Sequence, residues 1–102
     1  MRSGTQTWPR RSERIHVSMQ ASLLVDFEGK VSKHTASTVD LSNYGARVSA
    51  QASLQPGQAV TIVTGSRQET ALPGHVVWVG SVGTRLEGQL GIEFLRPVGF
   101  PV

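Results

Sequence analysis

Two groups of residues in this chain have the types and spacing needed to bind a small anion. One is a carboxylate, a hydroxyl and a glycine at fixed offsets within the stretch from Asp40 to Gly45, and the other is an arginine cluster, Arg10, Arg11 and Arg14. Guanidinium groups bind phosphates through paired hydrogen bonds and stack on flat rings. A carboxylate accepts hydrogen bonds from the ring and amino N–H groups of a guanine edge. The two groups together therefore suit a guanine nucleotide.

The excess positive charge of the chain lies entirely near its N-terminus. The 102 residues carry a formal net charge of +3. Residues 1–14 hold four arginines and one glutamate, whereas the remainder holds six basic and six acidic residues and is neutral. A basic arm on a neutral domain attracts an anion to one place, which argues against a surface wrapped by a polyanion.

Length and composition indicate one folded domain. Hydrophobic residues make up 38% of the chain and charged residues 17%, which fits a globular domain with one modest core. No apolar run approaches the roughly 20 residues of a membrane helix, and the first ten residues lack the apolar core of a signal peptide. We therefore expect a cytoplasmic protein with no membrane insertion.

Metal binding and catalysis are not expected. The chain has no cysteine, which excludes disulfides and thiolate metal sites. The three histidines, His16, His34 and His75, have neither the spacing of metal ligands nor acidic partners nearby. Ser42 lacks the glycine-flanked elbow of a serine nucleophile. We expect a binding protein that is not an enzyme and that uses no metal and no cofactor.

The hydrophobic pattern predicts strands throughout. Apolar and polar residues alternate from Val17 to Phe27 and again from Val31 to Leu41, so these two runs should form a hairpin. Four later strands are predicted at Ala46–Ala50, at Ala59–Thr64, in a run that ends at Val79, and at Gln89–Phe94. No segment shows helical periodicity beyond a turn or two.

Six short antiparallel strands fit a β-barrel or a β-sandwich. We favour an all-β, six-stranded antiparallel β-barrel, because an open sheet of this size would leave exposed edges. Trp78 and Phe94 are expected in its core. Pro73-Gly74 interrupts the strand that ends at Val79 and suggests a bulge or corner there.

The register of the predicted hairpin decides where the two candidate groups meet. A three-residue loop at Glu28–Lys30 places Phe27 opposite Val31 and gives a better core than a two-residue loop, which would exchange the faces. This register places Arg14 opposite Tyr44 and His16 opposite Ser42. Asp40 and Ser42 then point away from the core, which Val39 and Leu41 enter. The arginines and the Asp40–Gly45 stretch should therefore lie at the same end of the hairpin.

Two motifs of this chain resemble those of the PilZ domain family. Arg10-Arg11-Ser12-Glu13-Arg14 is similar to the family's R-x-x-x-R motif, and Asp40-Leu41-Ser42-Asn43-Tyr44-Gly45 is similar to its D/N-x-S-x-x-G motif. Two later segments resemble the family's later strands, namely Gly74-His75-Val76-Val77-Trp78 and Leu90-Gly91-Ile92-Glu93-Phe94. The resemblance covers about Arg10 to Leu95. PilZ domains are bacterial receptors for the second messenger cyclic di-GMP, and their fold is a six-stranded antiparallel barrel.

The resemblance implies a role for each motif residue. Arg10 and Arg14 would bind phosphates and the Hoogsteen edge of guanine, and Arg11 would add a stacking or phosphate contact. A guanine would be held by Asp40, Ser42 and Gly45. The expected periphery of this site consists of Trp8, His16, Asn43 and Tyr44.

The expected signal is a change in the arm. We divide the chain into a flexible tail at residues 1–9, a PilZ-like barrel domain with the arginine arm at 10–95, and a tail at 96–102. The arm from about Trp8 to Arg14 is expected to be flexible without ligand and to close over the nucleotide. Closure would change the surface offered to a downstream effector protein that the sequence does not identify.

Two other functions remain open at this point. A small barrel with a basic arm can bind single-stranded nucleic acid, but such proteins set several aromatic rings on exposed strands, and this chain has only six aromatic residues. Nucleic acid is therefore the less favoured partner. A PilZ-like scaffold that binds a protein without any ligand is the other alternative. The number of ligands per site, the oligomeric state and the affinity do not follow from the sequence.

Overall fold

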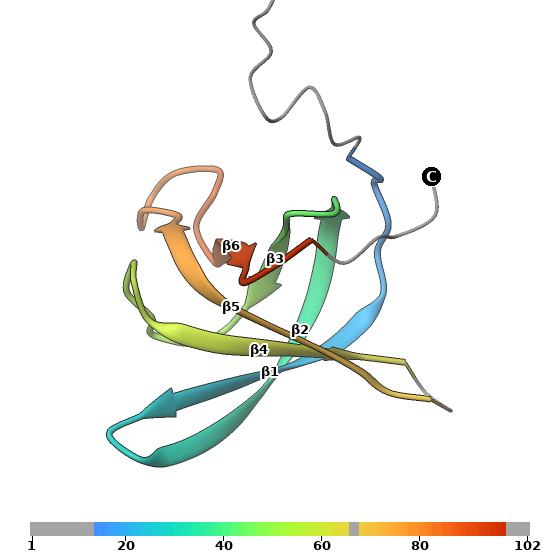
Figure 1. The fold of residues 1–102 in the computed structure, drawn as a ribbon. Coiled ribbons are helices and arrows are strands. Elements are labelled where there is room, and N and C mark those ends of the chain that lie inside the picture. Colours follow the sequence, from blue (N-terminus) through green and yellow to red (C-terminus); the bar gives the residue numbers. More distant parts are fainter. Residues whose placement is uncertain (1–13, 66–67, 98–102) are drawn as a thin grey trace, which may run out of the picture.

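Six antiparallel strands form a closed barrel in the computed structural model, which describes residues 14–65 and 68–97 (Figure 1). The strands are β1 (Gln20–Phe27), β2 (Lys30–Leu41), β3 (Gly45–Ala50), β4 (Ala59–Thr64), β5 (Thr70–Val79) and β6 (Gln89–Phe94). Their order around the barrel is β1-β2-β3-β6-β5-β4, and β4 closes it by pairing with β1. The predicted all-β barrel is confirmed. In the part of the chain that the structure describes, no helix has the length and apolar character needed to cross a membrane.

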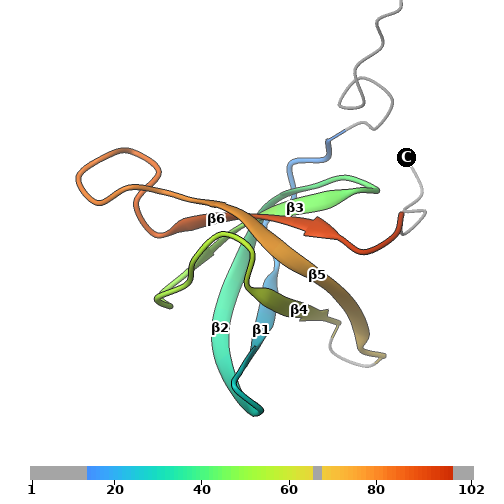
Figure 2. The ribbon, with the colours of Figure 1, turned by 60° about the vertical axis from the view of Figure 1, so that its left-hand side comes forward.

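The core is built from the alternate side chains that point into the barrel. Leu23, Val48 and Val76 are completely buried there, and Phe94 is buried as predicted. The first strand begins at Gln20, three residues later than the predicted Val17, while the β4 and β6 boundaries match the prediction. Figure 2 shows β3 and β6 side by side across one end of the barrel, with the β1–β2 hairpin projecting at the other.

The turn of the β1–β2 hairpin has two residues, so the predicted three-residue loop was wrong. Phe27 pairs with Lys30 and not with Val31. Glu28 and Gly29 both have positive φ, 53° and 81°, which is the requirement of a type I′ turn, and the twist of that turn matches the twist of paired strands. The polar face that this register creates is tolerated because the hairpin tip projects beyond its neighbours: β3 pairing stops at Ala36 and β4 pairing stops at Val25.

A bulge at Val39 changes which face the end of β2 presents. The register against β3 shifts between Thr38 and Asp40. Thr38, before the shift, and Leu41, after it, are both buried, so the residues that point into the barrel change from even to odd numbers. Val39 was predicted to enter the core, but it is only half-buried. Asp40 pairs with Arg47, which lies between two core residues of β3 and therefore points outward. The predicted outward direction of Asp40 holds.

A second bulge, at Val77 of β5, turns Trp78 outward. The register against β6 shifts between Val76 and Trp78, so Trp78 pairs with Gly91 on the outer face. The prediction that Trp78 lies in the core was wrong, because the extra residue exchanges the parity and the indole is only half-buried. Of the bulge or corner expected at Pro73-Gly74, the bulge is absent, since Gly74 pairs in regular register with both Val60 and Phe94.

The segment before β1 is fastened along β2. Ile15 forms a bridge with Leu41 through two backbone hydrogen bonds of 2.7 and 2.9 Å. The buried Thr38 hydroxyl donates to the Val17 carbonyl at 2.5 Å and accepts from the Met19 N–H at 3.0 Å. The Ile15–Leu41 bridge places Arg14 beside Ser42 and His16 beside Asp40, so the predicted partners Tyr44 and Ser42 were wrong by two residues.

Candidate functional site

Asp40 lies at the centre of the candidate site, held between two arginines. Its side chain is completely buried, whereas those of Arg14 and Arg47 are 45% and 35% exposed. One carboxylate oxygen accepts a hydrogen bond from Arg14 Nη1 at 2.5 Å. The other oxygen accepts two from Arg47, from Nε at 3.1 Å and from Nη2 at 2.7 Å. A buried carboxylate needs such partners, because an unpaired buried charge is strongly unfavourable.

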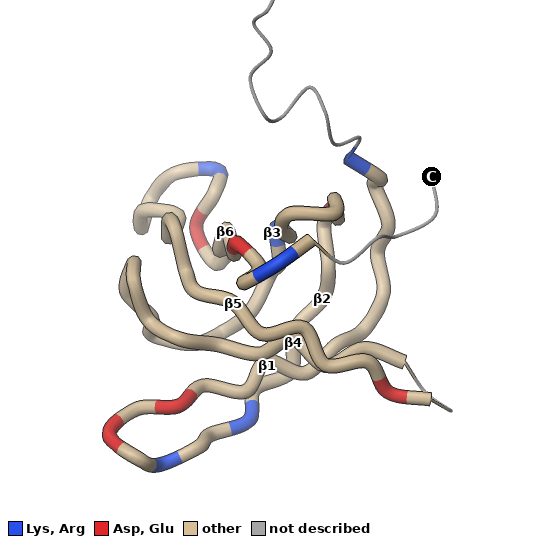
Figure 3. The backbone as a smooth tube through the Cα atoms, in the orientation of Figure 1, with Lys and Arg blue, Asp and Glu red and all other residues tan. Residues whose placement is uncertain are grey.

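The two arginines give this place a surplus of positive charge. Two guanidinium groups face the carboxylate of Asp40, and the other carboxylate of the outer face here, Glu93, lies 3.4 Å from His75. By contrast, Figure 3 shows acidic and basic segments near one another on the projecting β1–β2 hairpin, where they offset each other. Among the described residues, the end of β2 that carries Asp40 is therefore the favoured position for an anion to bind.

Ser42 and Gly45 shape the turn between β2 and β3. The Ser42 hydroxyl accepts hydrogen bonds from the N–H groups of Tyr44 and Gly45, each at 3.2 Å, and the Ser42 N–H donates to the Gly45 carbonyl at 2.9 Å. A Cβ atom at Gly45 would lie 2.3 Å from the carbonyl oxygen of Ile92, so only glycine lets β3 approach β6 this closely. Both residues therefore have structural roles that fix the position of Asp40.

Four residues form a row across the outer face of the barrel. Asp40 of β2 pairs with Arg47 of β3, and Arg47 pairs with Gly91 of β6. Gly91 in turn pairs with Trp78 of β5. Cross-strand partners point to the same face of a sheet. The bulges at Val39 and Val77 thus bring an ion-pair cluster and an indole onto the same surface.

A cavity of about 390 Å³ lies over this row. Its lining combines cationic, aromatic and apolar groups from Arg14, β3, β5 and β6: Arg14, Tyr44, Gly45, Ala46, Arg47, Val77, Trp78, Gly91, Ile92 and Glu93. A Cβ atom at Gly91 would lie 2.0 Å from the Trp78 Nε1, so the indole rests directly on the glycine backbone. Cationic groups beside an aromatic ring suit a ligand with both phosphates and a flat base.

Comparison with protein families gives the same assignment as the motifs. A family model described as PilZ domain matches residues 9–98. The chain belongs to the PilZ domain family. This confirms the resemblance inferred from the sequence. PilZ domains in general are receptors that bind cyclic di-GMP and are not enzymes. A comparison with curated proteins found no match to this chain.

The residues expected to bind ligand in this PilZ domain occupy different positions around the cavity. Arg14 and Gly45 line it, and so does Tyr44, which was expected at the periphery. Asp40 and Ser42 do not line it, because Asp40 lies beneath the two arginines and the Ser42 hydroxyl bonds to its own turn. His16 and Asn43 are also absent from the lining. The remaining expected residues lie outside the described part of the chain: Trp8, Arg10 and Arg11.

Arg47 and Trp78 are among the residues of the PilZ cavity that sequence reasoning missed. Arg47 could have been found, since the alternation of Ala46, Val48 and Ala50 already assigns it to the outer face next to Asp40. Trp78 could not, because its orientation depends on a bulge that no glycine or proline marks.

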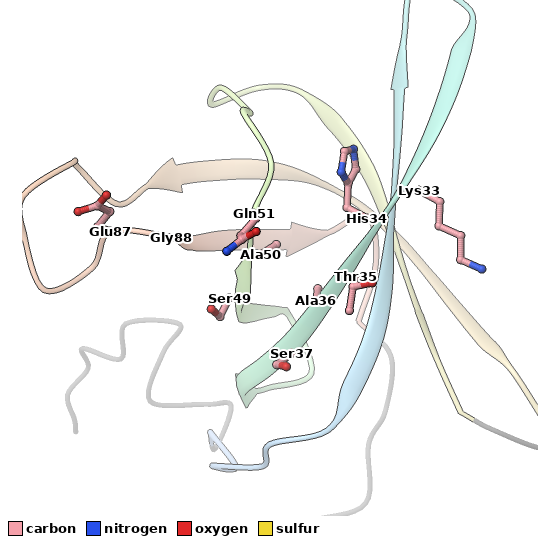
Figure 4. Close-up of a pocket in the computed structure, with 10 residues that line it drawn as sticks. All are labelled: Lys33, His34, Thr35, Ala36, Ser37, Ser49, Ala50, Gln51, Glu87 and Gly88. Carbon is pink, nitrogen blue, oxygen red and sulfur yellow. The ribbon is translucent and has the colours of Figure 1, made fainter.

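A larger hollow on the PilZ barrel has a less suitable lining. It measures about 680 Å³ and follows the outer side of β2 and β3 beside the β5–β6 loop (Figure 4). Its ionisable residues are Lys33, His34 and Glu87. Figure 4 shows the Lys33 side chain pointing away from Glu87. We therefore place the candidate site at the smaller cavity.

Proposed function

We propose that this PilZ domain binds cyclic di-GMP in the cavity over the Asp40–Trp78 row, through its R-x-x-x-R and D-x-S-x-x-G motifs. The observation that carries the proposal is the contact between Arg14 and Asp40, which joins the two motifs across 26 residues of sequence at the edge of the cavity. The volume of about 390 Å³ is within the range of small-molecule sites.

The cations would bind the phosphates. Arg14 lines the cavity, and Arg10 lies four positions before it in the motif. Guanidinium groups form paired, charge-assisted hydrogen bonds with phosphate oxygens. In this proposal Arg10 and Arg14 bind phosphates and the guanine edge, and Arg11 adds a further contact.

The guanine would lie against the fixed wall of the cavity. The indole of Trp78 presents a flat face beside Gly91, where a base can stack. The proposal assigns Asp40, Ser42 and Gly45 to guanine recognition, with His16, Asn43, Tyr44 and Trp8 at the rim. Since Arg14 covers Asp40 in the described structure, Asp40 can accept a guanine N–H only after Arg14 has moved.

The proposed signal is closure of the arm over the bound nucleotide. Arg14 is already held by Asp40 and by the neighbouring Ile15–Leu41 bridge, so the closing part would be the residues that precede Arg14. Their closure would alter the surface presented to an effector protein. The proposal includes the division into residues 1–9, 10–95 and 96–102, a non-enzymatic role and a bacterial, cytoplasmic setting.

Titration calorimetry with cyclic di-GMP tests the proposal. We expect saturable binding at micromolar ligand, with GMP and cyclic di-AMP as comparison ligands that bind more weakly. If cyclic di-GMP gives no heat of binding at these concentrations, the proposed function is wrong. A gel shift of single-stranded oligonucleotides at physiological salt would instead support the nucleic-acid alternative. If the protein binds neither cyclic di-GMP nor oligonucleotides, the protein-binding scaffold is the function that remains.

A further inference from the structure

The two arginines do not hold Asp40 in the same way. Arg14 gives one hydrogen bond to one carboxylate oxygen, whereas Arg47 gives two to the other oxygen. The side-on contact from Nε and Nη2 fixes the plane of the Arg47 guanidinium group. Arg47 is therefore the more firmly bound partner.

The backbone that carries Arg47 is also held more firmly by strand pairing than the backbone that carries Arg14. Arg47 lies within β3, with Asp40 of β2 on one side and Gly91 of β6 on the other. Arg14 precedes the first bridge of the described chain, which is formed by Ile15, and its side chain is the more exposed of the two. A movement of Arg14 would disturb one strand edge, whereas a movement of Arg47 would disturb the middle of the sheet.

The pairing also determines which arginine can leave Asp40. The carboxylate is completely buried, so it must keep a cationic partner at all times. If Arg14 leaves, both hydrogen bonds from Arg47 remain and the charge stays compensated. If Arg47 were absent, the departure of Arg14 would leave a buried carboxylate alone, and this cost would oppose ligand binding.

We propose that Arg47 is a positioning residue that keeps Asp40 paired and oriented while Arg14 passes from Asp40 to an anionic group of the nucleotide. This inference rests on the proposed function. It assigns to Arg47 an effect on affinity that acts through Asp40, although Arg47 itself lines the cavity. Ligand binding is then an exchange of partners for Arg14, and the Arg47–Asp40 pair is the same in the free and the bound protein.

A double-mutant cycle between Arg47 and Asp40 tests this exchange. Arg47→Ala is expected to weaken cyclic di-GMP binding by about tenfold or more, but by less than about threefold when Asp40→Asn is already present, since contacting residues are strongly non-additive. Arg47→Lys, which retains the charge, should restore part of the affinity. Binding is followed by NMR titration up to millimolar ligand, so that weak variants remain measurable, and thermal unfolding confirms that each variant is folded. Equal losses in both backgrounds would show that Arg47 acts on the ligand directly and would overturn the inference.

A crystal structure of the wild-type complex decides the matter where a variant does not fold or does not bind. The expected result is an Arg47–Asp40 contact unchanged from the free protein, with Arg14 on the nucleotide. Arg14 still on Asp40, or Arg47 turned onto the ligand, would overturn the exchange while leaving the proposed function intact. Wild-type protein that binds no cyclic di-GMP would overturn both.

Discussion

The indole of Trp78 rests on Gly91, its cross-strand partner, so closely that a Cβ atom at residue 91 would lie 2.0 Å from the indole Nε1. The nearest atoms that such a methyl group would meet all belong to the Trp78 side chain, so the indole would have to move. The orientation of an aromatic ring on the outer wall of the cavity thus depends on the absence of a side chain on the adjacent strand.

Gly91→Ala should displace the indole and lower both stability and affinity. The expected loss is about 1 to 3 kcal/mol of unfolding free energy, as for other overpacked sites. Denaturant unfolding measures the stability, and calorimetry with cyclic di-GMP measures the affinity. An unchanged affinity in a folded variant would show that the position of the Trp78 ring has no part in binding.

Trp78→Ala should weaken cyclic di-GMP binding by about tenfold or more, because stacking of a base on an aromatic ring contributes about 1 to 3 kcal/mol. Trp78→Phe, which keeps a smaller ring, should lose less. In a Trp8→Phe background the fluorescence reports on Trp78 alone, since the chain has two tryptophans. The absence of any fluorescence change on saturation would place the nucleotide away from this wall.

Arg14→Ala should cause the largest loss of affinity among substitutions in the described residues, about tenfold to a hundredfold, because it removes a charged hydrogen-bond donor. Asp40→Ala should also weaken binding severely, and it should destabilise the fold because both arginines lose their shared partner. Arg85→Ala is the matched control, since Arg85 is exposed in the β5–β6 loop outside the cavity. Wild-type affinity in both site variants would mean that the ligand binds elsewhere.

Thr38→Val should loosen the segment that carries Arg14. The valine keeps the shape but loses the hydrogen bonds to Val17 and Met19, which should cost about 1 to 3 kcal/mol of stability. Faster hydrogen exchange from Ile15 to Met19 and a severalfold weaker affinity should accompany this loss. Thr35→Val, at an exposed position of the same strand, serves as control and should change stability by less than about 0.5 kcal/mol.

Glu28→Asn should stabilise the protein without affecting the site. Glu28 is the only described non-glycine residue with positive φ, and asparagine tolerates this conformation better. We expect a gain of up to about 1 kcal/mol, or roughly 4 to 8 °C in the midpoint of thermal unfolding for a domain of this size. A lower midpoint would argue against the type I′ turn.

The strand pattern predicted the barrel well because six short alternating runs leave few other closed arrangements. The hairpin register was off by one residue at the turn, where Glu28-Gly29 forms a tight turn although it lacks the Asn-Gly or Asp-Gly signal. A second shift, at the Val39 bulge, makes the error two residues at the Ile15–Leu41 bridge. The meeting of Arg14 with the Asp40–Gly45 stretch was nevertheless predicted, because both motifs lie at the same end of the hairpin in either register. The outward orientation of Trp78 could not be predicted, since it depends on a bulge whose extra residue, Val77, is an ordinary strand former.

The bulges at Val39 and Val77 set the outer face of the barrel through the spacing along two strands. Under regular pairing Val77 would lie opposite Gly91 and Trp78 opposite the core residue Leu90. In the same way, Val39 would lie opposite Arg47 and Asp40 opposite the core residue Ala46. The outer face of this barrel is therefore encoded by the spacing along β2 and β5 as much as by residue identity, and strict alternation carried through either strand would assign Asp40 and Trp78 to the interior.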